Sequence, residues 1–137
     1  KPATVYFQTY DLKSEVINQM TNEDPFIFLN RELELRKKNN LPPFERFISL
    51  ILTSSNEKKL EKESLNLKEY LSKLINEKVL GPVESPIYKI KKKYRQRILI
   101  RAKKNSKIQK SLRVLLDKYK LPLEIKLTVD VDPINFN

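Results

Sequence analysis

The sequence predicts an α+β domain in which a four-stranded antiparallel sheet carries two helices on one face. From Arg46 onward, short apolar runs rich in branched residues alternate with amphipathic segments of helical period. Their order along the chain is β-α-β-β-α-β, the split-βαβ or ferredoxin-like arrangement. The last apolar run, Ile125–Val131, alternates apolar and polar residues, as expected for a sheet with one covered face.

A short strand and a helical extension are expected before this domain. Val5–Tyr10 is predicted to be a strand, and a short helix is expected to follow it and to reach Met20. Asp24 and Pro25 are typical of an N-cap followed by proline at the first helical position. They predict a second helix that ends near Asn39, before two prolines that cannot continue it.

Each element of the domain has its own signal. Gly81 and Pro82 are expected to break the chain, and Ser106 and Gln109 have the spacing of a capping box. The expected elements are a strand at Phe47–Thr53, a helix from the capping residues 54–57 to about Glu77, a strand at Pro86–Lys91, a tight connection near Lys92 and Lys93, a strand at Arg95–Ala102, a helix to about Tyr119 and a strand at Ile125–Val131.

The composition excludes several kinds of site. The 137 residues include 28 Lys and Arg against 17 Asp and Glu, a net charge of +11, with no His, no Cys and one Gly. There is therefore no disulfide, thiol nucleophile, Ser-His-Asp triad or soft-ligand zinc site. One glycine cannot supply a P-loop or a dinucleotide-binding fingerprint. No apolar run approaches the ~18 residues of a membrane-spanning helix, so a basic cytosolic module is expected.

The positive charge is concentrated in one part of the chain. Residues 81–120 hold fourteen basic and two acidic residues, a net charge of +12, so the other 97 residues together carry −1. A codon bias toward lysine would raise the total charge but would not segregate it. The segregation indicates that this part of the chain binds a polyanion, and nucleic acid is the first candidate. The alternative is that the charged residues only form a well-solvated surface.

The predicted strand Arg95–Ala102 would carry arginines on the face away from the helices. Residues two apart share a face, which groups Gln96, Ile98, Ile100 and Ala102 on the helix side and Arg95, Arg97, Leu99 and Arg101 on the other. Guanidinium groups bind phosphate oxygens bidentately. We expect one continuous positive surface, with candidate DNA-binding residues Lys89, Lys91, Arg95, Arg97, Arg101, Lys103, Lys104 and Lys107. Reversing the charges of Arg95 and Arg97 is expected to weaken binding and leave the fold intact.

Other chemistries have less support. An RNA-recognition domain needs aromatic residues on its central strands, and Leu99 stands where a ring is wanted. Phe47 and Tyr94 are the nearest rings, and Tyr94 fits either packing or stacking. Asp130 and Asp132 share a strand face, but two carboxylates without a third ligand make a poor Mg²⁺ or Ca²⁺ site. No metal site and no catalytic residue are expected.

Seven short segments stand in a characteristic order over nearly the whole chain. They are Phe7–Tyr10, Arg31–Arg36, Leu41–Arg46, Val79–Pro82, Pro86–Ile87, Lys93–Arg95 and Asp130–Pro133. Together they resemble the carboxy-terminal part of the PriA family, primosomal protein N′. Members of that family are ATP-dependent helicases that recognise abandoned replication forks. The resemblance implies that ATP, Mg²⁺ and Zn²⁺ belong to parts upstream of this chain, so no cofactor is expected here.

The resemblance also implies two domains and their partners. Residues 1–40 would be the end of the second helicase lobe with its connecting helices, and residues 41–137 a C-terminal domain for DNA binding and partner docking. That domain is implicated in binding forked or single-stranded DNA and the acidic tail of single-stranded-DNA-binding protein, with other primosome proteins as further partners. The tail-contacting positions map to Lys93 and to Arg97, which replaces a glutamine. The implied module has no enzymatic activity and acts in the cytoplasm, at the nucleoid.

Two other hypotheses stay open. One is an RNA-binding or ribosome-associated structural protein of the same ferredoxin-like fold, which would prefer structured RNA to forked DNA at matched salt. The other is a module for acidic peptides alone, which would have negligible affinity for nucleic acid.

Overall fold

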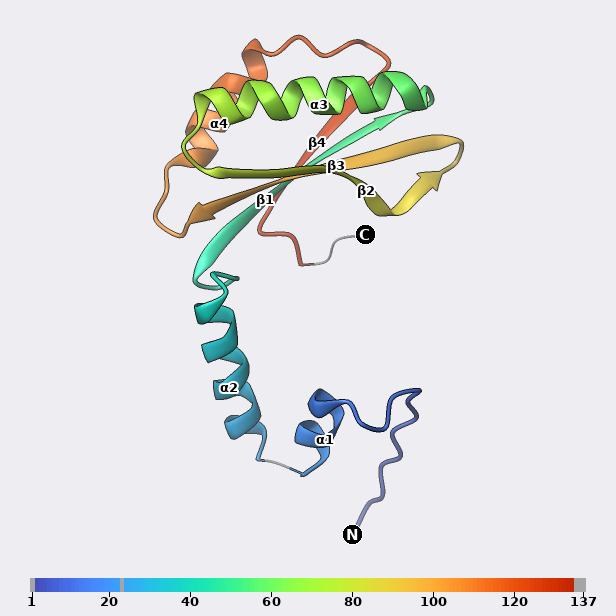
Figure 1. Ribbon diagram of the computed structural model, residues 1–137, viewed down its shortest axis with the longest axis vertical. Coiled ribbons are helices and arrows are strands. Elements are labelled where there is room, and N and C mark those ends of the chain that lie inside the picture. Colours follow the sequence, from blue (N-terminus) through green and yellow to red (C-terminus); the bar gives the residue numbers. More distant parts are fainter. Residues whose placement is uncertain (1, 23, 135–137) are drawn as a thin grey trace. The chain divides into compact units, whose positions relative to one another are not determined.

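A computed structural model describes residues 2–22 and 24–134 and separates the chain into two units, residues 1–39 and 40–137. The first unit contains α1 (Glu15–Asn22) and α2 (Pro25–Lys38). The second contains β1 (Glu45–Ser54), α3 (Glu57–Leu74), β2 (Lys78–Ile90), β3 (Lys93–Lys103), α4 (Ile108–Lys118) and β4 (Lys126–Val131), as Figure 1 shows. The predicted β-α-β-β-α-β order is confirmed.

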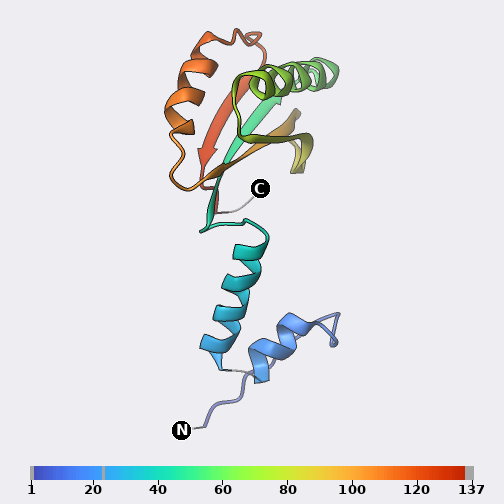
Figure 2. The same cartoon turned by 60° about the vertical axis from the view of Figure 1, so that its left-hand side comes forward.

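The four strands form one antiparallel sheet in the order β2-β3-β1-β4. The central strand β1 pairs with β3 from Glu45↔Lys103 to Ser54↔Tyr94, and with β4 from Ile48↔Val131 to Thr53↔Lys126. Helix α3 packs on β1, β2 and β3, whereas α4 lies beside β4 (Figure 2). The ferredoxin-like α+β fold, with both helices on one face of the sheet, is confirmed.

The core lies between this face of the sheet and the two helices. Along β1, alternate residues Ile48, Leu50 and Leu52 are 0% exposed. The other fully or nearly fully buried apolar residues are Ile98, Ile100 and Ala102 of β3, Leu60, Leu67 and Leu71 of α3, and Ile108 and Leu112 of α4. Each buried leucine or isoleucine stabilises the fold by about 1.5–3 kcal/mol. Together these residues give the second unit a hydrophobic core of its own.

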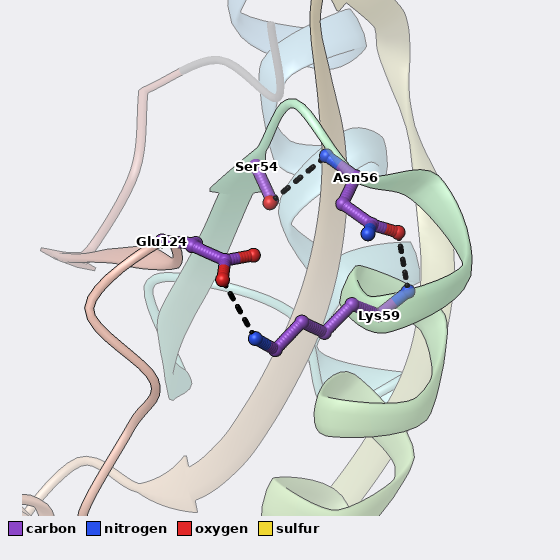
Figure 3. A network of polar contacts seen from close by, with 4 residues as sticks. All are labelled: Ser54, Asn56, Lys59 and Glu124. Atoms are coloured by element: carbon purple, nitrogen blue, oxygen red, sulfur yellow. Dashed lines mark hydrogen bonds and ion pairs between the residues drawn. The ribbon is translucent and has the colours of Figure 1, made fainter.

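A chain of polar contacts fixes the start of α3 (Figure 3). Asn56 caps the helix, because its Oδ1 accepts a hydrogen bond from the backbone N–H of Lys59 at 3.1 Å. The backbone N–H of Asn56 in turn donates to Oγ of Ser54 at 3.1 Å. Nζ of Lys59 lies 2.8 Å from Oε1 of Glu124, in the connection before β4. The predicted capping residues therefore act as expected, and the ion pair joins α3 to the α4–β4 connection.

The strand predicted at Val5–Tyr10 does not form. These residues have no regular secondary structure, and the described residues before Glu45 contain no strand. An isolated strand leaves its backbone groups unpaired, and the first unit offers it no neighbour. The two helices predicted there are confirmed, and Oδ1 of Asp24 caps α2 by accepting from the backbone N–H of Phe26 at 2.7 Å.

Gly81, expected to break the chain, lies inside a strand. β2 begins at Lys78, well before the predicted start at Pro86, and its pairing with β3 is irregular between Leu80 and Val83 and again after Glu84. The φ of Gly81 is +96°, and a Cβ there would lie 2.8 Å from the backbone oxygen of Arg97. The glycine therefore forms a bulge in β2 and does not end it.

The capping box predicted at Ser106 and Gln109 does not form either. α4 begins at Ile108, and Oγ of Ser106 accepts from the backbone N–H of Ile108 at 3.2 Å while donating to Oε1 of Glu77 at 2.7 Å. Glu77 is available because α3 stops at Leu74, three positions before its predicted end, where the chain turns into extended backbone to enter β2. Ser106 thus joins the β3–α4 loop to the α3–β2 loop.

Candidate nucleic-acid interface

β3 presents alternate residues to the face of the sheet opposite the helices, called here the open face. Gln96, Ile98, Ile100 and Ala102 are at most 8% exposed and lie on the helix side. Arg95, Leu99 and Arg101 are half-buried on the open face. The alternation predicted for this strand is therefore confirmed, and the arginines do share one face with the neighbouring side chains of β1, β2 and β4.

Arg97 lies on the open face but is not exposed. It retains 6% exposure and stands in register between Ile51 of β1 and Val83 of β2. Burial, and secondarily the positive charge of Arg95, lower the pKa of Arg97, while Asp130 acts in the opposite direction. Arg97 therefore lies on the predicted face, but its neighbours cover it. Reversing its charge would bury a carboxylate, so the double reversal of Arg95 and Arg97 is not expected to leave the fold intact.

Acidic residues of β1 and of the chain end beyond β4 neutralise part of the positive charge. Nε of Arg101 lies 2.9 Å from Oε2 of Glu45, and Nε of Arg46 lies 3.1 Å from Oδ2 of Asp132. Arg101 is thus engaged inside the domain, and the phosphate-binding capacity of this part of the sheet depends on the lysines around it.

A first group of ammonium groups lies at the tip of the β2–β3 hairpin. This hairpin cluster consists of Lys89, Lys91, Lys92 and Lys93, all exposed. Nζ of Lys89 donates to Oη of Tyr94 at 3.0 Å and lies 4.4 Å from the centroid of that ring. The hydrogen bond to Tyr94 raises the pKa of Lys89, so its side chain keeps its charge at neutral pH.

A second group lies where the chain passes from β3 to α4. This loop cluster consists of Lys103, Lys104 and Lys107, all exposed. β3 has 11 residues and crosses the whole sheet (Figure 1), so at ~3.3 Å per residue the two clusters are roughly 33 Å apart. Between them the open face carries Ser49, Ile51 and Leu99 together with the half-buried Arg95 and Arg101 and the buried Arg97. The exposed lysines therefore form two groups at opposite ends of the sheet, with the less exposed arginines of β3 between them, and the single continuous surface expected from the sequence stays a prediction.

The strand register adds two lysines that the sequence reasoning missed. Lys78 of β2 pairs with Arg101, and Lys126 of β4 pairs with Thr53, whose other neighbour is Arg95. Both lysines are exposed. They lie outside the basic stretch 81–120, so no local signal marked them; only strand pairing brings them to the arginines.

The aromatic residues of the strands mainly pack. Tyr94 contacts the core, and its ring centroid is 5.5 Å from that of Tyr88. The Tyr88 hydroxyl donates to Oε1 of Glu57 at 2.7 Å. Phe47 is the ring that the described strands place on the open face, half-buried opposite Arg101. This is short of the two or three stacking rings of an RNA-recognition domain, and Tyr94 is a packing residue.

Neither a metal cluster nor a membrane-spanning helix occurs among residues 2–22 and 24–134. No group of three or more Asp, Glu, His or Cys there could hold a metal ion, and Asp132, considered above with Asp130, pairs with Arg46. None of the helices in this part of the chain has both the length and the apolar character to span a bilayer.

The chain is similar in sequence to known proteins. Residues 37–134 match the family described as "Primosomal protein N C-terminal domain". The replication restart protein PriA of Rickettsia felis is 37% identical over 132 residues, which cover 96% of this chain and 20% of that protein. The PriA of Borreliella burgdorferi is 32% identical over 110 residues (79% of this chain, 17% of that protein). The PriA of Bacillus subtilis is 28% identical over 141 residues (97% of this chain, 17% of that protein). The chain spans at most 20% of the length of these relatives.

Proposed function

Since the chain belongs to the primosomal protein N C-terminal domain family, we propose that it is the DNA-binding and partner-docking module of a replication restart protein. The matched region is the C-terminal domain and not the helicase part of that protein, so this chain is expected to hydrolyse no ATP. Replication restart implies DNA and other primosome proteins as partners, and a cytoplasmic location at the nucleoid.

The observation that supports DNA binding is the +12 charge of residues 81–120, seven of whose lysines are exposed in the hairpin cluster and the loop cluster at the two ends of β3. Exposed lysines neutralise phosphates and release condensed counterions, which gives affinity without base sequence preference. The separation of the two clusters, roughly 33 Å, equals about ten steps of 3.4 Å along one strand of duplex DNA. One DNA segment can therefore reach both the hairpin cluster and the loop cluster. We propose that forked or single-stranded DNA is held in this way.

A titration of forked DNA across a salt series tests this function. If about five phosphates are neutralised, log K against log salt has a slope of roughly −4 to −5 for duplex DNA. Lys91→Glu with Lys104→Glu reverses one charge in each cluster and is expected to lower the affinity strongly. The matched control is Lys58→Glu with Lys62→Glu, two exposed lysines of α3. An affinity independent of salt, or equal losses in the two variants, would contradict the proposal.

Structured RNA added as a competitor at the same salt separates this function from its closest alternative. Forked DNA is expected to be displaced no better by RNA than by unlabelled forked DNA. A clear preference for structured RNA would favour an RNA-binding or ribosome-associated protein.

A second proposed role is docking of the acidic tail of single-stranded-DNA-binding protein. Lys93 and Arg97 lie on one face of β3, with Lys93 exposed beside the hairpin turn and Arg97 6% exposed. We expect Lys93 to make the direct contact and Arg97 to add its charge from below, so the chain binds such a tail weakly. Binding of a labelled acidic peptide is expected to fall in Lys93→Glu and to persist in Lys58→Glu. Peptide binding without any DNA affinity would instead support a module for acidic peptides alone.

For residues 1–39 we propose the end of the second helicase lobe, with its connecting helices. α2 buries none of its residues, and Phe26, Ile27 and Leu29 are more than half exposed. Large apolar side chains exposed in such numbers are typical of a surface that another part of a protein covers. Limited proteolysis is expected to cut this chain first within residues 1–39 and to leave residues 40–137 resistant.

A further inference from the structure

The turn between β2 and β3 is built from residues that suit its backbone poorly. Lys91 has φ = 48° and Lys92 has φ = 63°, and the two connect the paired residues Ile90 and Lys93. A two-residue hairpin turn with both φ values positive favours Asn-Gly. Lysine is disfavoured there, because its Cβ approaches the following carbonyl oxygen and its long side chain cannot offset this with the local hydrogen bond that a short polar side chain makes. Two consecutive lysines in this turn therefore reduce the stability of the domain.

The strained turn stands on a firmly packed base. Tyr94 follows the turn and contacts the core, while its hydroxyl accepts from Nζ of Lys89 at 3.0 Å. The ring of Tyr88 lies against Tyr94 with centroids 5.5 Å apart, and the Tyr88 hydroxyl donates to Glu57 at the start of α3. The ammonium groups of the hairpin cluster are thus presented from an ordered position, which lowers the entropy lost on binding an anion.

Acidic residues affect the two clusters differently. Near the loop cluster, Glu45 pairs with Arg101 and Glu77 accepts from Ser106, and both carboxylates line the same hollow as Lys103. Near the hairpin cluster, Glu57 accepts from the Tyr88 hydroxyl, and Glu84 and Glu61 also act on Tyr88 through their charge, whereas no acidic residue lies between Ser85 and Lys103 in the sequence. The turn residues Lys91 and Lys92 therefore have no acidic neighbour in the sequence, whereas Lys103 shares its hollow with two carboxylates.

We propose that the hairpin tip enters the major groove of duplex DNA, and that Lys91 and Lys92 occupy the strained turn because they contact the phosphates at its edges. The inference rests on the proposed DNA-binding function and names the duplex arm of a fork as the partner of the hairpin cluster. A two-stranded ribbon fits the major groove, which is ~12 Å wide. Ile90, 40% exposed beside the turn, supplies an apolar contact for base edges without selecting a sequence. Strain that persists in a turn is expected where the strained residues serve binding.

Replacing the turn by its favoured residues tests the proposal without weakening the fold. In the full chain, Lys91→Asn with Lys92→Gly removes two charges and the strain together. Its melting temperature is expected to rise by roughly 4–8 °C or more. Its affinity for a blunt duplex is expected to fall about tenfold, with a salt slope smaller by about 2 because two phosphate contacts are lost. Lys91→Arg with Lys92→Arg keeps the charge and is expected to retain the affinity.

Three comparisons decide the outcome, with blunt duplex and single strands of equal length as probes. Lys58→Gln with Lys62→Gln makes the same charge change on α3 and is expected to lose little affinity. Lys103→Asn with Lys104→Asn, in the loop cluster, is expected to lose less duplex affinity than the turn variant. The proposal is overturned if the loop variant loses more duplex affinity, or if the turn variant loses affinity for single strands only. In both of those cases DNA binding itself still stands. If no variant changes affinity or salt slope, the proposed function fails as well.

Discussion

Replacing Gly81 with alanine is expected to destabilise the domain strongly, although the change adds only one methyl group. The φ of Gly81 is +96°, and its new Cβ would lie 2.8 Å from the backbone oxygen of Arg97 and 3.2 Å from the backbone nitrogen of Val83. The unfavourable backbone conformation costs about 1–2 kcal/mol, and crowding against backbone atoms adds about 1–3 kcal/mol. The free energy of unfolding should therefore fall by about 2–5 kcal/mol.

Thermal unfolding followed by circular dichroism measures this effect. For a domain of this size, 1 kcal/mol corresponds to roughly 4–8 °C, so the melting temperature should fall by at least ~8 °C. Val83→Ala is the control, because Val83 lies in the same bulge but is 58% exposed, and its effect should stay below about 1 kcal/mol. A Gly81→Ala variant that melts within ~4 °C of the parent would show that the bulge yields and that the reasoning from the close contact is wrong.

Three further results are expected. Leu50→Ala, at a 0% exposed position of β1, should lower the free energy of unfolding by about 2–5 kcal/mol in urea; a loss below about 1 kcal/mol would contradict the core described here. Lys59→Ala should lower the free energy of unfolding by at most about 1 kcal/mol, because its ion pair with Glu124 is exposed. The same substitution in a variant that already lacks Glu124 should have an equally small effect, and a larger coupling energy in this double-mutant cycle would refute the expectation. Hydrogen bonding to Glu57 raises the pKa of Tyr88 above its ordinary 10.0. The protonated Tyr88 hydroxyl therefore stabilises the folded domain below pH 10, and this contribution is lost as the pH rises toward the raised pKa. Tyr88→Phe should therefore show a smaller fall in melting temperature above pH 10 than the parent, and identical pH profiles would exclude the linkage.

Local spacing in the sequence was enough to predict the type and order of the elements from β1 to β4, although not the start of β2 or the end of α3. Alternation placed Ile98 and Ile100 toward the helices, and the helical period placed Leu67 and Leu71 toward the sheet, as the structure confirms. Such patterns involve residues a few positions apart, so they are legible before the chain folds. The same holds for the concentration of charge in residues 81–120, which is a property of composition along the chain.

Only the tertiary structure decided which of those charges reach the surface. The burial of Arg97 depends on Ile51 and Val83, and the pairing of Arg101 depends on Glu45, 56 positions earlier in the chain. Val5–Tyr10 has the composition of a strand but lacks a partner, since a strand is completed by hydrogen bonds to another segment. Burial, ion pairing and strand formation all require groups from distant parts of the chain to meet, and no local pattern in the sequence specifies that meeting.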